Sequence, residues 1–567
     1  MDASFRRDMK HSQLLRAALL GGALSTPAYS QVILPSDGLR GDFFGYSVDV
    51  STGQAIVGAP FHDERGISSG AAYIYGLSAG PFAHSQVSKL TPPDDSGGAC
   101  FGISVAVDDV LAAVGAPGAN VPGSGPGKVH VFMDSGSWKV DEVLSASPGS
   151  DRDRFGEAVD LEGKWLAVGA PRDDERGTDA GAVYLYRRNG SGWQLRQKVF
   201  APSTGPGDSF GFSLDLDGQR LAVGAYQNDL GTTNAGAVYV FVRSGNDWII
   251  ESTLLHPDPD LNDHLGRSVD LSGDLLIAGT PEDDDVGSQA GAALVWRLQG
   301  TVWGLAAELR ASDGAAGDSF GHSVCVGPEG RLLVSAPNDD DFGFSSGGVY
   351  LYEPSGTGWN SALKHPFGEP APGDYLGLDM SYDGQYGLVG LMFNDTLDID
   401  AGAAMGLEAG EFPSDWAVAG CFCDEGPCGN NDSSAGCSNS TGQGAVLQAN
   451  GSNSVTADDL LLTASPLPAQ QPAFLLMGSD NVSVFLRDGL RCADAGSGSL
   501  YGFTGSSDAN GSLTYGPGLV ARSTGFDSGG TILAGATWNF QVWYRDLAGP
   551  CGQGTNLSSS VMVTFAP

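Results

Sequence analysis

Apolar and polar positions follow a pattern that recurs about every 55 residues along the first two thirds of the chain. Within one repeat, an alternating stretch such as residues 212–216 follows a Phe-Gly or Leu-Gly pair. An apolar run such as residues 166–168, an apolar-aromatic run such as residues 182–186 and a Trp-led stretch come next. Short strand-like runs separated by turn residues such as Asp217-Gly218 predict four antiparallel strands per repeat.

The repeat begins seven times, each time with a Phe or Leu before a Gly: Phe44-Gly45, Phe101-Gly102, Phe155-Gly156, Phe210-Gly211, Leu265-Gly266, Phe320-Gly321 and Leu376-Gly377. Seven units of four strands, with no helical periodicity between them, predict an all-β fold, a seven-bladed β-propeller. We expect each Phe to pack between neighbouring blades, and each Gly to hold a backbone position that a side chain could not share.

The seventh repeat ends near Ala404 without a Trp-led fourth strand. Gln31–Leu34, by contrast, resembles the segments that precede the other Phe-Gly pairs. We therefore expect the first strand of the chain to complete the last blade, which would leave only short sheet edges.

The chain changes character after residue 410. Residues 411–443 are rich in Cys, Gly, Asn and Ser and are expected to form a linker, and residues 444–567 carry short strand-like runs typical of a small β-sandwich. An even set of cysteines lies here and predicts disulfides of undetermined pairing, with a zinc site as the alternative: Cys421, Cys423, Cys428, Cys437, Cys492 and Cys551. Buried aromatics on a strand explain Trp538, Trp543 and Tyr544 best, and carbohydrate binding through them is the alternative.

Residues 1–30 combine a basic start, a short apolar run and small residues at Ala28 and Ser30, the features of a secretory signal peptide. No stretch reaches the length of a transmembrane helix. The formal net charge is −38, from 67 acidic and 29 basic residues, which argues against nucleic acid as a partner. We expect a secreted, extracellular or cell-surface protein of residues 31–567.

Phe-Gly followed at fixed distance by Gly-Ala-Pro, as at Phe155-Gly156 and Gly169-Ala170-Pro171, resembles the FG-GAP repeats of the integrin α-chain propeller and of related secreted bacterial proteins. The resemblance implies a platform for protein ligands. In integrins it also implies calcium in Asp-x-Asp-x-Asp-Gly loops, but the corresponding turns here, such as Glu162-Gly163, lack the alternating oxygen ligands. The integrin calcium sites are therefore not expected.

An Asp does recur after each Gly-Ala-Pro-type segment except the second: Asp63, Asp174, Asp229, Asp284, Asp340 and Asp395. An Asx-type turn between the second and third strands explains this spacing, and loops that bind a cation such as calcium are the alternative. If these loops bind calcium, it should raise the melting temperature. No cofactor is otherwise required by the sequence.

Arg40-Gly41-Asp42 spells a tripeptide that integrins bind, but Gly41 and Asp42 are turn positions that recur before the other Phe-Gly pairs, so we interpret it as a turn. We find no nucleophile elbow and no phosphate-binding loop. The sequence thus favours a binding or adhesion protein that uses a propeller face to bind a protein or polysaccharide, rather than an enzyme. A carboxylate-dependent polysaccharide-degrading enzyme and a structural envelope component are the alternatives.

Overall fold

The computed structural model describes residues 31–565, except 52, 78–84, 94–96, 119–124, 148, 191, 328–329, 342, 356–357, 361–362, 365–369, 409–416, 421–436, 451–454, 456–457, 459, 479, 487–488, 495–499, 510, 527–530, 534–535 and 551–553. The signal-peptide prediction for residues 1–30 lies outside the described residues. No helix in the described part of the chain is long and apolar enough to cross a membrane.

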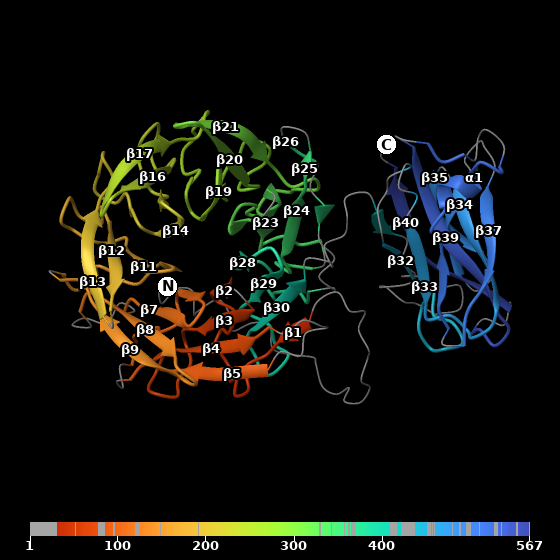
Figure 1. The fold of residues 1–567 in the computed structure, drawn as a ribbon, viewed down its shortest axis with the longest axis horizontal. Helices are drawn as coiled ribbons and strands as arrows, with labels where there is room; N and C mark the ends of the chain where they lie inside the picture. The colour runs from red at the N-terminus through yellow and green to blue at the C-terminus, as the bar shows by residue number, and fades with distance from the viewer. Residues whose placement is uncertain are drawn as a thin grey trace.

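Seven four-stranded antiparallel sheets stand around a ring and form the β-propeller (Figure 1). Numbered along the chain and given from the innermost strand outward, the first three blades are β2 (Val48–Ser51), β3 (Gln54–Ala59), β4 (Ala71–Gly76) and β5 (Ser85–Leu90); β6 (Val105–Asp108), β7 (Leu111–Ala116), β8 (Lys128–Asp134) and β9 (Trp138–Leu144); and β10 (Val159–Glu162), β11 (Trp165–Ala170), β12 (Ala182–Asn189) and β13 (Gly192–Val199).

Blades 4, 5 and 6 follow the same order: β14 (Ser213–Asp217), β15 (Arg220–Ala225), β16 (Ala237–Ser244) and β17 (Asp247–Leu254); β18 (Val269–Ser272), β19 (Leu275–Thr280), β20 (Ala292–Gln299) and β21 (Val302–Leu309); and β22 (Val324–Val326), β23 (Leu332–Ala336), β24 (Gly348–Tyr352) and β27 (Leu363–Lys364). In blade 6 the prediction of a Trp-led outer strand is wrong, because Trp359 lies in a separate hairpin of β25 (Pro354–Ser355) and β26 (Gly358–Trp359). Pro354, which has no backbone N–H, starts this hairpin.

The predicted ring closure is confirmed. Blade 7 consists of β28 (Met380–Tyr382), β29 (Tyr386–Leu391), β30 (Ala403–Glu408) and, as its outer strand, the N-terminal β1 (Gln31–Ile33). The strands β1 and β30 pair in register from Gln31 opposite Gly406 to Ile33 opposite Ala404. A backbone bridge between Phe44 and Gly402 then links the last blade to the first, as the bridge between Gly291 and Phe320 links blades 5 and 6.

The recurring Phe residues are core residues. Phe44, Phe101, Phe155, Phe210 and Phe320 are fully buried. Phe155 shares an apolar cluster with residues of both blade 2 and blade 3, and its ring meets that of Tyr184 edge to face at 5.2 Å. Full burial of such a side chain stabilises the interface by about 1.5–3 kcal/mol.

The C-terminal region contains a five-stranded and a three-stranded sheet. The larger has the order β31 (Ala417–Gly420), β40 (Gly554–Thr564), β39 (Thr537–Asp546), β34 (Pro472–Gly478) and β37 (Tyr501–Ser506). The smaller comprises β32 (Val446–Asn450), β33 (Leu461–Ser465) and β38 (Leu513–Tyr515). A hairpin of β35 (Asp480–Leu486) and β36 (Gly489–Asp494) and one short helix, α1 (Leu519–Ser523), complete the region.

These two sheets bury their apolar side chains in one common cluster, which includes Leu462 and Phe540. Two observations differ from the expected linker over residues 411–443. Strand β31 pairs with β40, and Asn439 donates to the Tyr544 hydroxyl at 3.1 Å. Part of that stretch therefore belongs to the C-terminal fold.

The predicted cysteine framework is described only in part. Cys437 is buried and disulfide-bonded. Cys421, Cys423, Cys428 and Cys551 lie outside the described residues, and for Cys492 only the backbone, in β36, is described. Cys100 and Cys325, both in the propeller, are buried thiols.

Candidate functional site

The six aspartates predicted as cation loops lie in the connections between the second and third strands of their blades, and all six are exposed. Four of the carboxylates accept the backbone N–H of the residue five positions on, at 2.7–2.9 Å: Asp63 from Ser68, Asp174 from Asp179, Asp229 from Asn234 and Asp395 from Asp400. These bonds close the Asx-type turn that was the first explanation of the spacing.

The residue before each of these aspartates is polar and inward-facing, and its side chain accepts the backbone N–H two positions on. Asp173 accepts from Glu175, and Asp339 accepts from Asp341. In blades 1, 3, 5 and 6 a basic side chain also binds the loop, namely Lys89, Lys198, Arg310 and Lys364. In these four blades a protein ammonium or guanidinium group thus lies beside the carboxylates of the loops that were the alternative candidates for cation binding.

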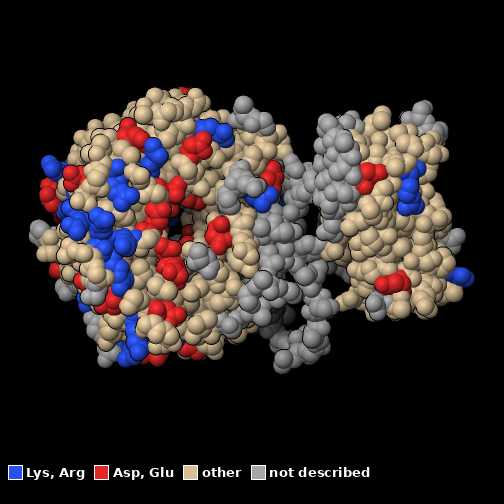
Figure 2. All heavy atoms as spheres, viewed as in Figure 1, with Lys and Arg blue, Asp and Glu red and all other residues tan. Residues whose placement is uncertain are grey.

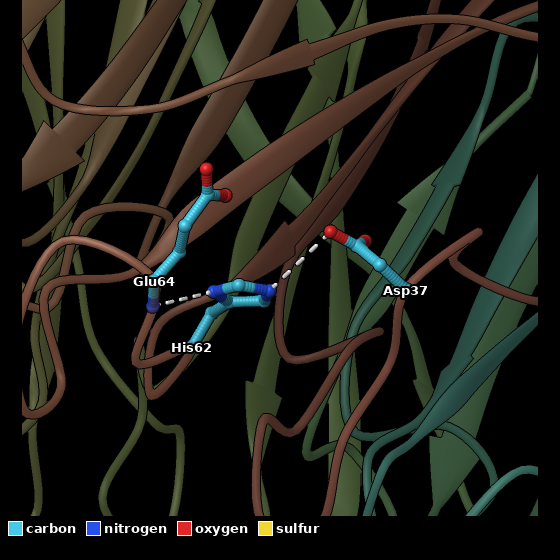
Figure 3. Close-up of side chains that lie close together, drawn as sticks. All are labelled: Asp37, His62 and Glu64. Carbon is cyan, nitrogen blue, oxygen red and sulfur yellow. Dashed lines mark hydrogen bonds and ion pairs between the residues drawn. The ribbon is translucent and has the colours of Figure 1, made fainter.

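Blade 1 contains the one group of three potential metal-ligand side chains found among the described residues: Asp37, His62 and Glu64 (Figure 3). The Glu64 backbone N–H donates to His62 Nδ1 at 3.1 Å, and His62 Nε2 lies 3.8 Å from Asp37 Oδ2. Lys89 Nζ lies 2.5 Å from both Asp37 Oδ2 and Glu64 Oε2, and 3.1 Å from His62 Nε2. The Lys89 ammonium therefore already supplies the positive charge that a metal ion would bring to this group.

Removing one of these ammonium groups should destabilise the propeller and create a requirement for another cation. Lys364 Nζ lies 2.5 Å from carboxylate oxygens of both Asp339 and Asp341, and Asp339 is buried. We expect Lys364→Met to lower the free energy of unfolding by about 3 kcal/mol, because the buried carboxylate loses its partner. Calcium should recover part of this loss in the variant and leave the wild type unchanged.

Chemical denaturation with and without calcium and a chelator measures both effects, and Lys139→Met, at an exposed position on β9, controls for the change in charge. A calcium-dependent rise in wild-type stability would favour the cation-loop hypothesis over this account.

The central channel carries a set of carboxylates that the sequence reasoning did not single out. Asp49, Asp160, Asp215 and Asp270 each lie four residues after the Gly of a Phe-Gly or Leu-Gly pair, on the innermost strands β2, β10, β14 and β18, and Asp379 precedes β28. We call these five the channel carboxylates. Figure 2 shows acidic side chains gathered around the hollow at the centre of the ring. The fixed spacing of four residues after the Gly was the available sequence signal for the first four, whereas Asp379 lies only two residues after Gly377.

Each channel carboxylate joins two blades. Asp49 accepts the backbone N–H of Val107, Asp160 that of Leu216, and Asp270 that of Val326, all at 2.6–2.7 Å. Asp215 and Asp379 accept in the same way from Leu271 and Val48, at 2.9 Å. These N–H groups lie on the inner edges of the sheets, where no further strand is available as a partner.

Burial raises the pKa of every channel carboxylate. The value reaches about 6 for Asp49 and Asp270, about 7 for Asp379 and about 8 for Asp160, and that of Asp215 is also raised well above its usual range. Mutual repulsion adds to this effect, since the charge of Asp49 raises the pKa of Asp160 further. The channel interior therefore shifts all five carboxyl groups toward the protonated form, by different amounts.

Two kinds of connection lie at the same end of the blades: those between the second and third strands of a blade, and those that lead from one blade to the next. Together they form one face of the propeller. We call it the loop face. Neighbouring connections are hydrogen-bonded, as Gly373 N–H to Phe344 O at 2.8 Å and Gly41 N–H to Ile399 O at 3.1 Å show. The residues that follow each Phe-Gly or Leu-Gly pair lie at the channel mouth on this face: Tyr46, Ile103, Glu157, Phe212, Arg267, His322 and Leu378.

Among the described connections of the propeller, exposed apolar side chains lie mainly on the loop face. Eight large ones form what we call the apolar arc, in the connection between blades 4 and 5 and on and between blades 5, 6, 7 and 1: Leu39, Ile67, Leu255, Leu261, Val286, Phe344, Leu397 and Ile399. Ile67 and Phe344 are the most exposed, at 78% and 77%. The described connections of the opposite face contribute only Val110, and a further set lies on the outer strands of the ring: Val32, Val87, Val140, Val143, Leu195, Ile249, Ile250, Val302 and Leu305.

Inside the apolar arc, a chain of half-buried aromatic rings runs across blades 7 and 1. Phe393 contacts Tyr375 at 5.0 Å and Phe43 at 5.1 Å between ring centroids, and Phe43 contacts Phe61 at 5.2 Å. Tyr46 extends the row to the channel mouth. Such edge-to-face contacts fix the rings in place and present a rigid apolar surface.

The Arg-Gly-Asp tripeptide lies in this region but is not available to a receptor. Asp42 is buried, and its carboxylate accepts the backbone N–H of Leu39 at 2.8 Å. The same bond recurs at Asp153, Asp208, Asp263, Asp318 and Asp374. The tripeptide is therefore a turn, as the sequence indicated.

Comparison with solved structures gives distant similarities only. A putative 6-phosphogluconolactonase from Bacteroides fragilis NCTC 9343 aligns at 12% identity and a TM-score of 0.39, over 56% of this chain and 82% of that chain. Sqt1 of Saccharomyces cerevisiae aligns at 13% identity and a TM-score of 0.36, over 66% of this chain and 97% of that chain. Sqt1 of Chaetomium thermophilum aligns at 13% identity and a TM-score of 0.39, over 62% of this chain and 81% of that chain. No curated protein matches the chain.

The FG-GAP repeat matches six segments, at residues 29–75, 84–132, 138–186, 193–241, 248–296 and 303–352, which together cover more than half of the chain. Each segment begins within two residues of the start of the outer strand of one blade and ends in the third strand of the next, as 84–132 runs from β5 to β8. The repeat unit is thus offset by one strand from the blade. The chain belongs to the FG-GAP repeat family.

Proposed function

We propose that this chain is a binding or adhesion protein that uses the loop face of its propeller to hold a protein partner at or outside the cell surface. The apolar arc is the observation that carries this proposal. Export rests on the sequence of residues 1–30, as argued above. A polysaccharide ligand is the alternative that the aromatic rings leave open.

A concentration of exposed apolar side chains on one face of a monomer is typical of a protein interaction site. Phe344, Ile399, Leu39 and Ile67 stand on loops held by backbone hydrogen bonds, so a partner would meet a surface that is already ordered. The charged loops beside the apolar arc are partly neutralised by the basic side chains described above, which limits electrostatic repulsion of a partner.

We do not propose catalysis. The channel carboxylates are the strongest candidates for an acid and a base, but each of them holds a backbone N–H of the neighbouring blade, which gives them a structural role. Turnover of a polysaccharide by the purified protein would overturn this part of the proposal.

A library of random displayed peptides, selected on the immobilised full-length protein, tests the apolar arc. We expect the wild type to enrich peptides with apolar side chains. The double variant Ile67→Ser/Phe344→Ser should capture them at least about tenfold more weakly, because each lost apolar contact contributes about 1 kcal/mol or more. Val110→Ser/Val302→Ser, outside the loop face, is the matched control and should capture them normally.

Failure of the wild type to enrich any peptide, or equal weakening by both double variants, would contradict the proposal. A glycan array and a hydrolysis assay on the same preparation complete the test. Glycan binding that the arc variants leave unchanged would identify a polysaccharide ligand instead.

A further inference from the structure

The loop-face mouth of the channel contains guanidinium groups in an otherwise acidic protein. Arg267 follows the Leu265-Gly266 pair of blade 5. Its Cζ atom lies 4.6 Å from the ring centroid of Phe212 and 6.0 Å from that of Tyr226, both of blade 4. Phe212 and Tyr226 contact each other at 4.5 Å, so the guanidinium rests on a fixed aromatic support.

Arg267 acts on groups of several other blades, which places it close to the ring axis. Burial raises the pKa of Tyr46 in blade 1 to about 12, and Arg267 opposes this rise. Burial lowers the pKa of His322 in blade 6 to about 3, and Arg267 lowers it further. Burial raises the pKa of Asp379, before β28 of blade 7, to about 7, and Arg267 again opposes the rise. Only a charge near the channel axis can reach three blades in this way.

The carboxylates at the mouth already have partners. Glu157 Oε1 lies 2.7 Å from Arg154 Nη2, and Glu282 Oε2 lies 3.1 Å from His264 Nδ1. Among the described residues, no Asp or Glu side chain lies within the 4.0 Å ion-pair distance of the Arg267 guanidinium group. Arg267 is therefore a half-buried positive charge with no described carboxylate in direct contact, although it lowers the pKa of the nearby Glu282 and opposes the rise in that of Asp379.

We propose that Arg267 is the binding site for an acidic side chain of the protein partner, inserted at the channel mouth while the partner's apolar surface covers the apolar arc. This inference rests on the proposed function and names the chemistry of its ligand. A guanidinium that stacks on an aromatic ring keeps its N–H edge free, and that edge matches a carboxylate in a bidentate pair. The aromatic row from Tyr375 to Tyr46 connects the mouth to the apolar arc, so both contacts belong to one surface.

The channel itself limits how far the acidic side chain can enter. The channel carboxylates lie on or beside the innermost strands, as Asp270, three residues beyond Arg267 in the chain, illustrates. Burial raises their pKa values because an ionised carboxylate is disfavoured there, so the partner's ionised acidic residue should stop beside Arg267.

The peptide selection described above tests this anchor when it is repeated with Arg267→Met. Wild type should enrich peptides that combine apolar side chains with an Asp or Glu, and Arg267→Met should enrich apolar peptides without the acidic preference. Arg176→Met is the matched control, because Arg176 also lies on the loop face and also stacks on a Phe ring, with its Cζ 4.9 Å from the centroid of Phe200. This variant should keep the acidic preference.

A second measurement compares two peptides on the wild type, so its main result does not depend on the folding of any variant. The most enriched peptide is synthesised with its acidic residue and, separately, with the corresponding amide. We expect the amide peptide to bind wild type about tenfold more weakly or worse, and the two peptides to bind Arg267→Met equally.

The outcomes separate the two proposals. Apolar peptides enriched without an acidic residue, or an amide peptide that binds wild type as well as the acid, would overturn the anchor and leave the apolar arc in place. Enrichment of basic peptides would overturn the anchor as well. No enrichment on wild type would overturn both.

Discussion

Replacing Gly291 with alanine is expected to prevent the propeller from folding under conditions where the wild type is stable. A Cβ atom at this position would lie 2.2 Å from the carbonyl oxygen of Phe320 and 2.6 Å from its backbone nitrogen. Both atoms belong to the backbone bridge between blades 5 and 6, so neither can move without separating the blades. We expect a loss of about 4 kcal/mol or more in the free energy of unfolding.

Gly273→Ala in the same blade is the matched control. Gly273 also has a positive φ, 62°, but no atom lies within 4 Å of an added Cβ. Only the backbone cost of about 1–2 kcal/mol is expected there. Chemical denaturation followed by circular dichroism measures both variants, and similar losses for the two would show that φ, and not the approach of the blades, decides the cost.

Asp160→Asn is expected to stabilise the protein at pH 8 and to have little effect at pH 4. Burial raises the pKa of Asp160 to about 8, with a further contribution from Asp49. In the unfolded chain an aspartate titrates near pH 3.9. Between these values the folded state binds more protons than the unfolded state, so the stability contributed by Asp160 falls as pH rises from about 4 to about 8.

An asparagine cannot ionise, and its side-chain oxygen can still accept the N–H of Leu216 that Asp160 accepts at 2.6 Å. Its amide nitrogen then faces the N–H of Leu161, which the other oxygen of Asp160 accepts at 2.7 Å, and the loss of this bond offsets about 1 kcal/mol of the gain. The variant should therefore gain on the order of a few kcal/mol over wild type at pH 8. Asp247→Asn, at an exposed position on β17, controls for net charge. Melting curves from pH 4 to pH 8 measure the difference, and an Asp160→Asn variant that is less stable than wild type at pH 8 would contradict the account.

The propeller could be predicted from the sequence because its signals are local and repeated. A Phe that must be buried, a Gly that must approach a backbone and a run of apolar residues each recur at one spacing, so random variation averages out over seven copies. The closure by β1 followed from the same reasoning, since Gln31–Leu34 matched the segments before the other repeats.

The candidate site was predicted less well, for a physical reason. The aspartates after the Gly-Ala-Pro segments stood out because they recur, yet recurrence there reflects a turn that every blade needs. Arg267 stands at a position occupied by a different residue in every blade, as Tyr46, Glu157 and Phe212 illustrate. Its environment comes from residues of other blades, which no spacing within one repeat reveals.

The Lys and Arg side chains that bind the acidic loops were missed although they follow their loop carboxylates by 23 or 25 residues, because spacing alone does not show that the outer end of a blade lies beside its own loop. Lys89, for example, meets Glu64 across two strands of blade 1, whereas Arg310 lies just beyond β21. Charge composition alone predicted a solvated acidic surface or bound cations. Neutralisation of the acidic loops by the protein's own Lys and Arg side chains could be predicted only by knowing which strand lies beside which loop.

The offset between repeat unit and blade bears on how such a gene can grow. A duplicated unit of the kind matched at residues 84–132 would add one outer strand and three inner strands. The outer strand would complete the blade before the insertion, and the three inner strands would form a new blade that the next outer strand in the chain completes. No strand would be left unpaired at either junction, so the new protein would carry an intact ring wall immediately after the duplication. Selection could then act on the loop residues of the added copy in a protein whose ring of blades already folds.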